Sequence, residues 1–246
     1  MKKGLAVLSD IHSNLEALSA VLKDLKAQKV EQIVCLGDIV GYASDPGECL
    51  QAIRKLGCQT LLGNHDEAAC LPDPPQNLND TAVAGIVFAA AQLTGSDRSW
   101  LLSLPRNLEI GGAAFTHASL AKPCGWHYIL TGEAALSHFA EQPTPVAFCG
   151  HTHKPMVWIQ DSSGGPLTQS PGAGVVALPQ GGKALVNVGA VGQPRDGDPR
   201  ASYVIYRPDR ATVEFRRVGY DIPRTMKKIL RANLPGFTAQ RLAHGR

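Results

Sequence analysis

The chain has 246 residues, of which 44% are hydrophobic and 18% charged, with 24 basic against 21 acidic side chains. This balance excludes an intrinsically disordered chain, and a formal net charge of +3 is too small to indicate a nucleic-acid or membrane partner. Six cysteines without a CxxC pair, in a sequence that shows no secretory signal, predict reduced thiols and a cytoplasmic location.

Short apolar runs alternate with helical patterns in the first half of the chain. Ser13 predicts the start of a helix, because Glu16 follows it at the spacing of a capping box. The alternation of strands and helices favours a largely parallel sheet with right-handed crossovers. The elements expected in this half are strands at 4–9, 32–38 and 58–64 and helices from Ser13 onwards and at 46–56.

The middle of the chain is more helical, and the last third is rich in strands. Gly, Ser and Pro at 162–174 predict a loop. Because no linker or internal repeat is evident, the pattern predicts one domain, residues 1–246, with two facing sheets and helices outside. The expected elements are helices at 80–93, 97–104, 132–140 and 221–234 and strands at 107–111, 113–117, 146–151, 154–159, 175–178, 184–188, 202–206 and 212–218.

Polar side chains stand at the carboxyl ends of five of the predicted strands. In open α/β sheets the ligand crevice lies outside the carboxyl ends of the strands. These strand ends therefore deliver carboxylate, amide and imidazole groups to one edge. The residues concerned are Asp10 and His12, Asp38, then Asn64, His65 and Asp66, then His117, and finally His151 and His153.

The residue types at this edge predict metal ligands. Asp10 and His12, like His151 and His153, are two positions apart, so in an extended segment both members of a pair point to the same side. Glycines before three of the motifs let the chain turn sharply and approach an ion closely. Oxygen and imidazole ligands without thiolate suit Mn, Fe or Zn. Their number exceeds the needs of one ion, so we expect two divalent ions, most readily Mn or Fe, with Zn as a further option.

The ordered motifs DxH, GD, GNHD, H and GHTH, from Asp10 to His153, resemble those of the calcineurin-like metallophosphoesterase superfamily. The segment NVGAVGQPRDGDPRASY, which begins at Asn187, is similar to the C-terminal segment of its small bacterial members. Ala190 and Thr116 depart from the residues most common at those positions, and neither is a predicted metal ligand. The resemblance implies a four-layer α-β-β-α sandwich of two facing mixed sheets, in agreement with the pattern of elements.

The resemblance also implies a role for each motif residue. A hydroxide that bridges two metal ions would attack phosphorus in line. His65 would act beside the phosphate as a general acid or charge stabiliser, oriented by Asp66. The ligands that it implies are Asp10, His12 and His153 at the first metal, Asn64, His117 and His151 at the second, and Asp38 between the two.

Two further residues are candidate substrate ligands. Arg195, in the loop 193–200, is predicted to reach the phosphate as a bidentate donor, and a turn in which it pairs with a neighbouring aspartate is the alternative. Asn187 ends an apolar run as the metal ligands do, with a strand cap as its alternative. Residues 126–128 either stack on a base or aryl group or pack within their loop. The sequence leaves open whether the loop 193–200 closes over the site.

The predicted reaction is hydrolysis of phosphate esters, by a phosphodiesterase or phosphomonoesterase with two metal ions. A dinucleoside polyphosphate (Ap4A-type) hydrolase and a serine/threonine protein phosphatase are alternatives. The modest chain length favours a small phosphorylated, nucleotide-like substrate. No basic stripe with interleaved aromatic residues indicates nucleic acid, and a homo-oligomer stays open. A catalytically inactive binding scaffold is the alternative of another class, although such scaffolds lose part of the ligand set that is complete here.

Overall fold

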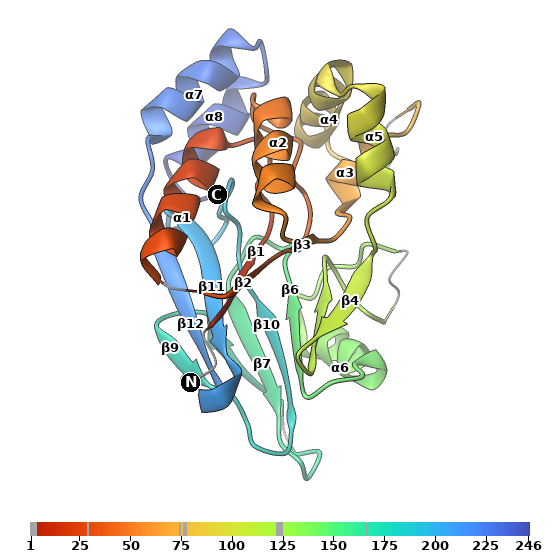
Figure 1. Cartoon of the computed structure of the whole chain (residues 1–246), viewed down its shortest axis with the longest axis vertical. Helices are drawn as coiled ribbons and strands as arrows, with labels where there is room; N and C mark the ends of the chain where they lie inside the picture. Colours follow the sequence, from red (N-terminus) through yellow and green to blue (C-terminus); the bar gives the residue numbers. More distant parts are fainter. Residues whose placement is uncertain (1–3, 29, 74, 76–77, 122–124, 166) are drawn as a thin grey trace.

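Two six-stranded sheets lie face to face in the computed structural model, and helices cover them from outside (Figure 1). The structure describes residues 4–28, 30–73, 75, 78–121, 125–165 and 167–246. Cys124, one of the six cysteines of the sequence, lies outside these residues.

The first sheet joins the β-α units of the first half to antiparallel strands from the end of the chain. In spatial order its strands are β3 (Gln59–Thr60), β2 (Gln32–Cys35), β1 (Leu5–Leu8), β11 (Ala201–Arg207), β12 (Thr212–Val218) and β9 (Val175–Ala177). β1, β2 and β3 run parallel, with Leu5 opposite Gln32, and β11 pairs with β1 antiparallel. The carboxyl ends of β1, β2 and β3 therefore meet at one edge.

The second sheet repeats this arrangement with strands from the middle of the chain. Its spatial order is β4 (Asn107–Ile110), β5 (Ala113–Thr116), β6 (Val146–Cys149), β10 (Lys183–Asn187), β7 (Met156–Gln160) and β8 (Thr168–Pro171). β5, β6 and β10 are parallel to one another, so their carboxyl ends also share an edge. Both sheets are mixed, as the sequence predicted.

Helices pack on the outer face of each sheet. α1 (Leu15–Gln28) and α2 (Pro46–Leu56) cover the first sheet, and α6 (Gly132–Glu141) covers the second. The other helices flank α1 and α2 (Figure 1) and are α3 (Asn64–Ala68), α4 (Asp80–Gln92), α5 (Gly95–Leu102), α7 (Ile222–Arg231) and α8 (Gly236–Leu242). Within the described residues, none of the helices has the length and apolar character that crossing a membrane requires.

Three apolar layers hold the sandwich together. Phe115 and Phe148 stack between the two sheets with their ring centroids 5.2 Å apart. Leu18 of α1 packs against the first sheet, and Phe139 of α6 packs against the second. Burial of each such side chain contributes roughly 1.5–3 kcal/mol. The four-layer α-β-β-α fold predicted from the sequence is confirmed.

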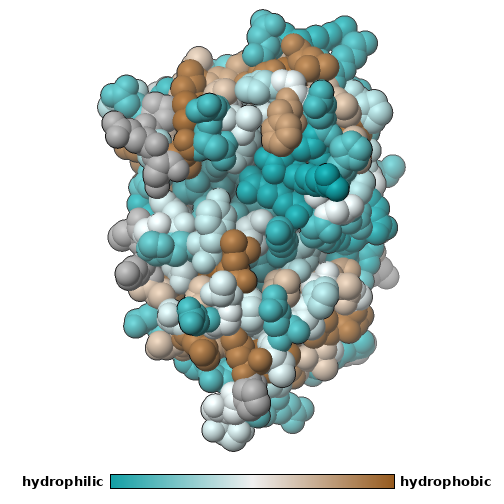
Figure 2. All heavy atoms as spheres, turned by 180° about the vertical axis from the view of Figure 1, so that it is seen from behind, coloured by the Kyte–Doolittle hydropathy of each residue, from teal (hydrophilic) through white to brown (hydrophobic). Residues whose placement is uncertain are grey.

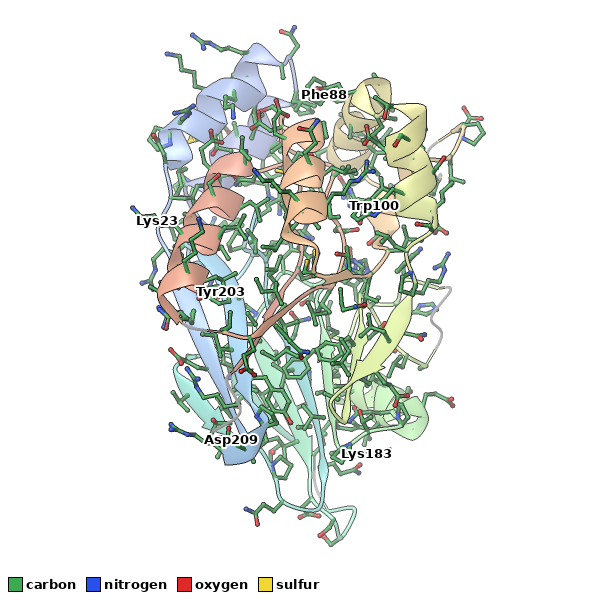
Figure 3. All side chains as sticks on the ribbon, viewed as in Figure 1. Lys23, Phe88, Trp100, Lys183, Tyr203 and Asp209 are labelled. Atoms are coloured by element: carbon green, nitrogen blue, oxygen red, sulfur yellow. The ribbon has the colours of Figure 1, made fainter. Side chains whose placement is uncertain are left out.

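Tyr203 on β11 fastens the first sheet to α1. Its hydroxyl donates a hydrogen bond to Oδ2 of Asp24 on α1 (2.6 Å), and Nε of Arg216 donates to the same oxygen (2.8 Å). Figure 3 shows Tyr203 beside α1, at the junction between the helix and the sheet. The contact fixes the C-terminal half of α1 against β11.

The start of α1 differs from the prediction. Asn14 caps the helix, because its Oδ1 accepts a hydrogen bond from N of Ala17 (3.1 Å). Ser13 has a left-handed backbone (φ 55°), and Glu16 pairs with Lys228 on α7 (2.9 Å) instead of closing a capping box. A long-range ion pair therefore replaces the local hydrogen bonds of the predicted capping box.

One strand and two short helices lie where the sequence predicted none. β8 falls inside the predicted loop 162–174. The sequence did not indicate this strand, because its residues TQSP are mostly exposed at the sheet edge and show no apolar alternation. α3 has five residues and α8 has seven. Elements this short contain too few turns for an apolar period to be recognised.

Buried His138 on α6 predicts a pH dependence of stability. Its Nδ1 accepts a hydrogen bond from N of Leu120 (3.1 Å), and burial lowers its pKa to about 4 from the ordinary 6.5. Because the folded pKa lies below the unfolded one, stability is full above pH 6.5 and is lost as the pH falls towards 4. Between pH 7.5 and 5, the wild type should lose about 2 kcal/mol more free energy of unfolding than His138→Asn. Urea denaturation at both pH values measures this difference, and equal losses in the two proteins would contradict it.

Candidate active site

The structure brings the seven predicted metal ligands together at the shared edge of the two sheets. A hydrogen bond from N of His151, after β6, to Oδ2 of Asp10, after β1 (3.0 Å), joins the sheets there. Three overlapping groups of histidine and aspartate side chains have ligand atoms within 4.8 Å of one another. They are Asp10 with His12 and His153, His12 with Asp38 and His65, and Asp38 with His117 and His151.

Asp38 lies between two sets of donor atoms. On one side its Oδ2 is 3.6 Å from Nε2 of His12, and Oδ1 of Asp10 is 3.2 Å from Nε2 of His153. On the other side the same Asp38 oxygen is 3.4 Å from Nε2 of His117. This histidine also lies 3.1 Å from Oδ1 of Asn64. One carboxylate therefore faces both sets.

The backbone at five of the seven predicted metal ligands is left-handed, not extended. φ is 55° at Asp10, 49° at His12, 53° at Asp38, 66° at His151 and 60° at His153. The i, i+2 pairs therefore do not lie on extended segments, the case in which both members would point to the same side. A left-handed non-glycine residue costs on the order of 1–3 kcal/mol and persists where the surrounding structure enforces it, most often at functional sites.

Glycines let the ligand loops approach one another. A Cβ atom on Gly63 would lie 2.2 Å from N of Asp38, and one on Gly150 would lie 2.1 Å from Oγ of Ser9. Real Cβ atoms do not come this close to other heavy atoms, so any other residue would push the loops apart. These two glycines thus allow close contact between the loops.

Backbone carbonyls orient three of the imidazoles. In each, Nδ1–H donates to a carbonyl oxygen, which leaves Nε2 directed at the cluster. The pairs are His12 with Val40 (3.1 Å), His117 with Leu36 (3.1 Å) and His153 with Gln193 (2.7 Å). His151 is turned the other way: its Nε2–H donates to O of Trp126 (2.8 Å), which leaves Nδ1 for the cluster.

This donor set fits metal ions. Nε2 of His12 and Nε2 of His153 are 3.1 Å apart, and both rings carry their proton on Nδ1. Two nitrogen lone pairs therefore face each other beside buried carboxylates, an arrangement that a shared cation stabilises. Nitrogen and oxygen donors without thiolate suit Mn, Fe or Zn.

Burial and neighbouring charges shift the pKa values of the site in opposite directions. Burial alone would raise the pKa of the Asp10 and Asp38 carboxyls, but neighbouring His153 and His117 hold both pKa values well below the usual range. Burial lowers the pKa of His151 to about 4 and that of His153 to about 3. Burial opposes protonation of His117 as well, yet Asp38 raises its pKa to about 9. Metal binding would release that proton.

His65 lies within the cluster, and its ring is 4.7 Å from that of His12. Its Nδ1 is buried and has no hydrogen-bond partner among the described atoms. A Cβ atom on Gly41 would lie 2.5 Å from that nitrogen, so Nδ1 faces the Gly41 backbone. Burial lowers the pKa of His65 well below its usual value. Nε2 of a neutral imidazole is thus the atom left to act on a ligand.

Asp66 contacts backbone groups instead of the His65 ring. Its Oδ1 accepts hydrogen bonds from N of Ile39 (2.8 Å) and Val40 (3.0 Å), and Oδ2 accepts one from N of Gly63 (3.2 Å). Burial, together with the nearby Asp38 carboxylate, raises the pKa of Asp66 to about 7. The carboxyl group therefore shapes the turn after Asp38.

Arg195 lies beside the cluster. Its Nη2 donates to Oη of Tyr42 (3.1 Å) and to Oε1 of Gln193 (3.0 Å), and the Tyr42 ring is 4.7 Å from that of His12. The aspartates of its own loop pair elsewhere, Asp196 with Arg217 and Asp198 with Arg200. The guanidinium is thus held at the site and not in a turn paired with Asp196 or Asp198.

The Asn187 side chain makes three hydrogen bonds with neighbouring loops. Its Nδ2 donates to O of Gly150 (2.6 Å) and to Oγ1 of Thr152 (3.0 Å), while Oδ1 accepts from N of Gly189 (3.0 Å). These bonds match the strand-cap alternative, and they hold the GHTH loop. Asn187 is buried and is not among the residues that line the crevice described next.

A crevice of about 550 Å³ opens beside the cluster. Figure 2 shows a hollow with hydrophilic residues gathered in it, whereas the hydrophobic residues on that face form small separated groups. Sequence reasoning missed Tyr42 as a member of the site, although it lies only four positions after Asp38 of the second motif. The lining residues include Tyr42, Asn64, His65, Trp126, Tyr128 and His151.

A four-layer sandwich with aspartate, asparagine and histidine at its shared sheet edge defines a metallophosphoesterase architecture. The calcineurin-like phosphoesterase superfamily domain model matches residues 4–210. The chain therefore belongs to the calcineurin-like phosphoesterase superfamily, whose members act on phosphate esters, and this family implies divalent metal ions.

Similar proteins span the whole chain. Protein MJ0912 of Methanocaldococcus jannaschii is 36% identical, with 100% of both chains covered. The crystal structure of a metallophosphoesterase from Sphaerobacter thermophilus has a TM-score of 0.87 and 38% identity, with 99% of both chains covered. Protein PH1004 of Pyrococcus horikoshii OT3 shares the fold, with a TM-score of 0.81, 21% identity and coverage of 99% of this chain and 98% of that one.

Proposed function

We propose that the chain is a dinuclear metal-dependent hydrolase of small, nucleotide-like phosphate esters and acts as a single catalytic domain. The observation that carries the proposal is the position of Asp38, with Oδ2 3.6 Å from His12 Nε2 on one side and 3.4 Å from His117 Nε2 on the other. Mn and Fe suit these donors best, with Zn as an alternative. The five described cysteines are free thiols, which supports a cytoplasmic location.

Each side chain of the site would have its own role in binding the ions or the phosphate. Asp10, His12 and His153 would hold one ion, Asn64, His117 and His151 the other, and Asp38 would contact both. When bound, the ions supply an activated water and neutralise charge on the phosphoryl oxygens. Arg195, held by Tyr42, would donate to a phosphate oxygen. His65 would donate from Nε2 to charge that develops at the phosphate. Asp66 and Asn187 would fix the loops that carry these groups.

Turnover of bis(p-nitrophenyl) phosphate and p-nitrophenyl phosphate, with Mn²⁺ and with chelator, tests the proposal. Chelator-sensitive hydrolysis of either ester is the expected result, and the preferred ester distinguishes a phosphodiesterase from a phosphomonoesterase. Protein that binds no metal and hydrolyses neither ester would instead be the inactive scaffold.

Glu67 is expected to influence metal binding through Trp126. Its Oε2 accepts a hydrogen bond from Nε1 of Trp126 (3.0 Å), and the Trp126 carbonyl orients His151. Trp126 has a left-handed backbone (φ 49°) that this side-chain contact helps to hold. Glu67→Ala should weaken one of two Mn²⁺ sites about tenfold, the usual cost of losing a group that orients a ligand. Calorimetric titration of chelator-treated protein measures this, with Glu67→Gln, which keeps an acceptor, as the control. Wild-type affinity at both sites in Glu67→Ala would contradict the prediction.

A further inference from the structure

The crevice continues away from the metal ligands along an apolar wall. At one end it is lined by Asn64, His65 and His151, the residues closest to where a phosphate would bind. The wall beyond them comes from α3, from the segment before α4 and from α4 itself. Ala68, Pro75, Leu78 and Ala82 make its apolar part, and Asn79 adds a polar side chain. A group attached to the phosphate would therefore meet carbon atoms as well as this amide.

Tyr128 presents an aromatic surface to this crevice. One face of its ring stacks on His151, with centroids 4.0 Å apart and planes 13° apart. The residue is still 49% exposed, so the ring is held in place while part of it stays open to a ligand. An aromatic ring fixed in this way offers stacking area at little cost in side-chain entropy.

The crevice has little free charge. Apart from histidines, Glu67 is the only charged side chain among the described residues that line it. Its carboxylate is already engaged, Oε1 by Nη2 of Arg106 and Oε2 by Nε1 of Trp126. A polyphosphate chain or an acidic phosphopeptide would need cations along this path. Two guanidiniums lie near it and both are engaged: Arg106 pairs with Glu67 and lies over the Trp126 ring (4.6 Å), and Arg195 is bound to Tyr42.

We infer that this crevice is a subsite for a flat, uncharged leaving group, a nucleoside or an aryl alcohol, and that Tyr128 is its stacking surface. The inference rests on the proposed function, since the group is carried by the phosphate ester that the metal cluster would hydrolyse. It gives the site a preference for esters with one phosphate and one ring system. Dinucleoside polyphosphates and phosphoproteins fit this crevice less well.

A pair of substrates that differ only in the base tests the inference. Adenosine 5′-monophosphate and ribose 5-phosphate share the phosphate and the primary alcohol that leaves, and their methyl esters form the same pair for a diesterase. The ratio of kcat/KM within the pair cancels any change in the metal chemistry. We expect a ratio of about ten or more in the wild type, the size of one base–aromatic stack. Inhibition of p-nitrophenyl ester turnover by each compound gives the ratio independently.

Variants of Tyr128 then test whether its ring causes the preference for the substrate that carries a base. Tyr128→Ala should bring the ratio close to one, and Tyr128→Trp should keep it. Leu130→Ala, two positions along the same loop, is the matched control, because Leu130 is 55% exposed and does not line the crevice. A wild-type ratio near one, or an unchanged ratio in Tyr128→Ala, would overturn the inference and leave the proposed function intact. Failure to hydrolyse any ester in a chelator-sensitive way would overturn the proposed function itself.

Discussion

Replacement of Asp38 by asparagine is expected to lower kcat for p-nitrophenyl esters by about 10³-fold, because bound metal ions supply several kcal/mol of charge stabilisation. Asp38 lies between both sets of donor atoms, and no other carboxylate among the described residues is shared by two of the groups that could hold a metal. The amide keeps an oxygen that can accept the hydrogen bond from N of His65 (2.8 Å in the wild type). The fold should therefore persist while the charge that faces both ions is lost.

Metal analysis separates this effect from unfolding. We expect wild-type protein to bind two Mn²⁺ per chain and Asp38→Asn to bind one or none, with an unchanged circular dichroism spectrum. Asp45→Asn is the matched control, because Asp45 is also a buried carboxylate, but it pairs with Lys228 (2.6 Å) on α7. Activity of Asp38→Asn within threefold of the wild type, with two ions bound, would remove the bridging role.

The donor set could be predicted from sequence because its chemistry lies in side-chain identity. Asp10, Asp38 and His117 each end an apolar run, and parallel strands bring their carboxyl ends to one edge. These side chains therefore lie at that edge, whatever conformation the loops adopt. The two facing sheets could also be predicted, because both the first half and the last third of the chain show strand patterns.

The groups that orient the ligands could not be predicted, because most are backbone atoms. The carbonyls of Val40, Leu36 and Gln193 fix three imidazoles, and any residue type carries a carbonyl. Asp66 was assigned to its neighbour in sequence, His65, whereas its carboxylate reaches N of Ile39, 27 positions away. Sequence proximity is a poor guide once tight turns separate a side chain from its neighbours.

The backbone conformation of the loops that carry the predicted ligands could not be predicted from the sequence either. Spacing of two residues fits an extended strand, but the loops after β1 and β6 are left-handed at both members of each pair. Propensity argues against this conformation for aspartate and histidine less than for other residues. Long-range hydrogen bonds hold it, such as those from N of His151 to Asp10 and from N of His12 to O of Asp38. The first of these joins positions 141 apart and leaves no local pattern.

Substitution of His65 by glutamine is expected to lower kcat about 10²-fold without loss of metal, the typical cost of removing one donor to developing charge. Burial keeps the pKa of His65 well below its usual value, so the ring is neutral at pH 7. A neutral imidazole is a good hydrogen-bond donor and a poor proton donor. We therefore expect His65 to stabilise charge on the phosphoryl group and not to protonate the leaving oxygen.

Leaving groups of different basicity decide between these two roles. A charge stabiliser gives similar losses for a p-nitrophenyl ester and for an alkyl ester, whereas a general acid gives a much larger loss for the alkyl ester, whose alkoxide needs a proton. Metal analysis tests a third role, that of a metal ligand, because His65 lies within 4.8 Å of ligand atoms of His12 and Asp38. Loss of an ion in His65→Gln would make it a ligand, and a loss confined to alkyl esters would make it a general acid. His138→Asn, a change at a buried histidine on α6, controls for general effects of replacing a buried imidazole and should leave turnover of both esters unchanged.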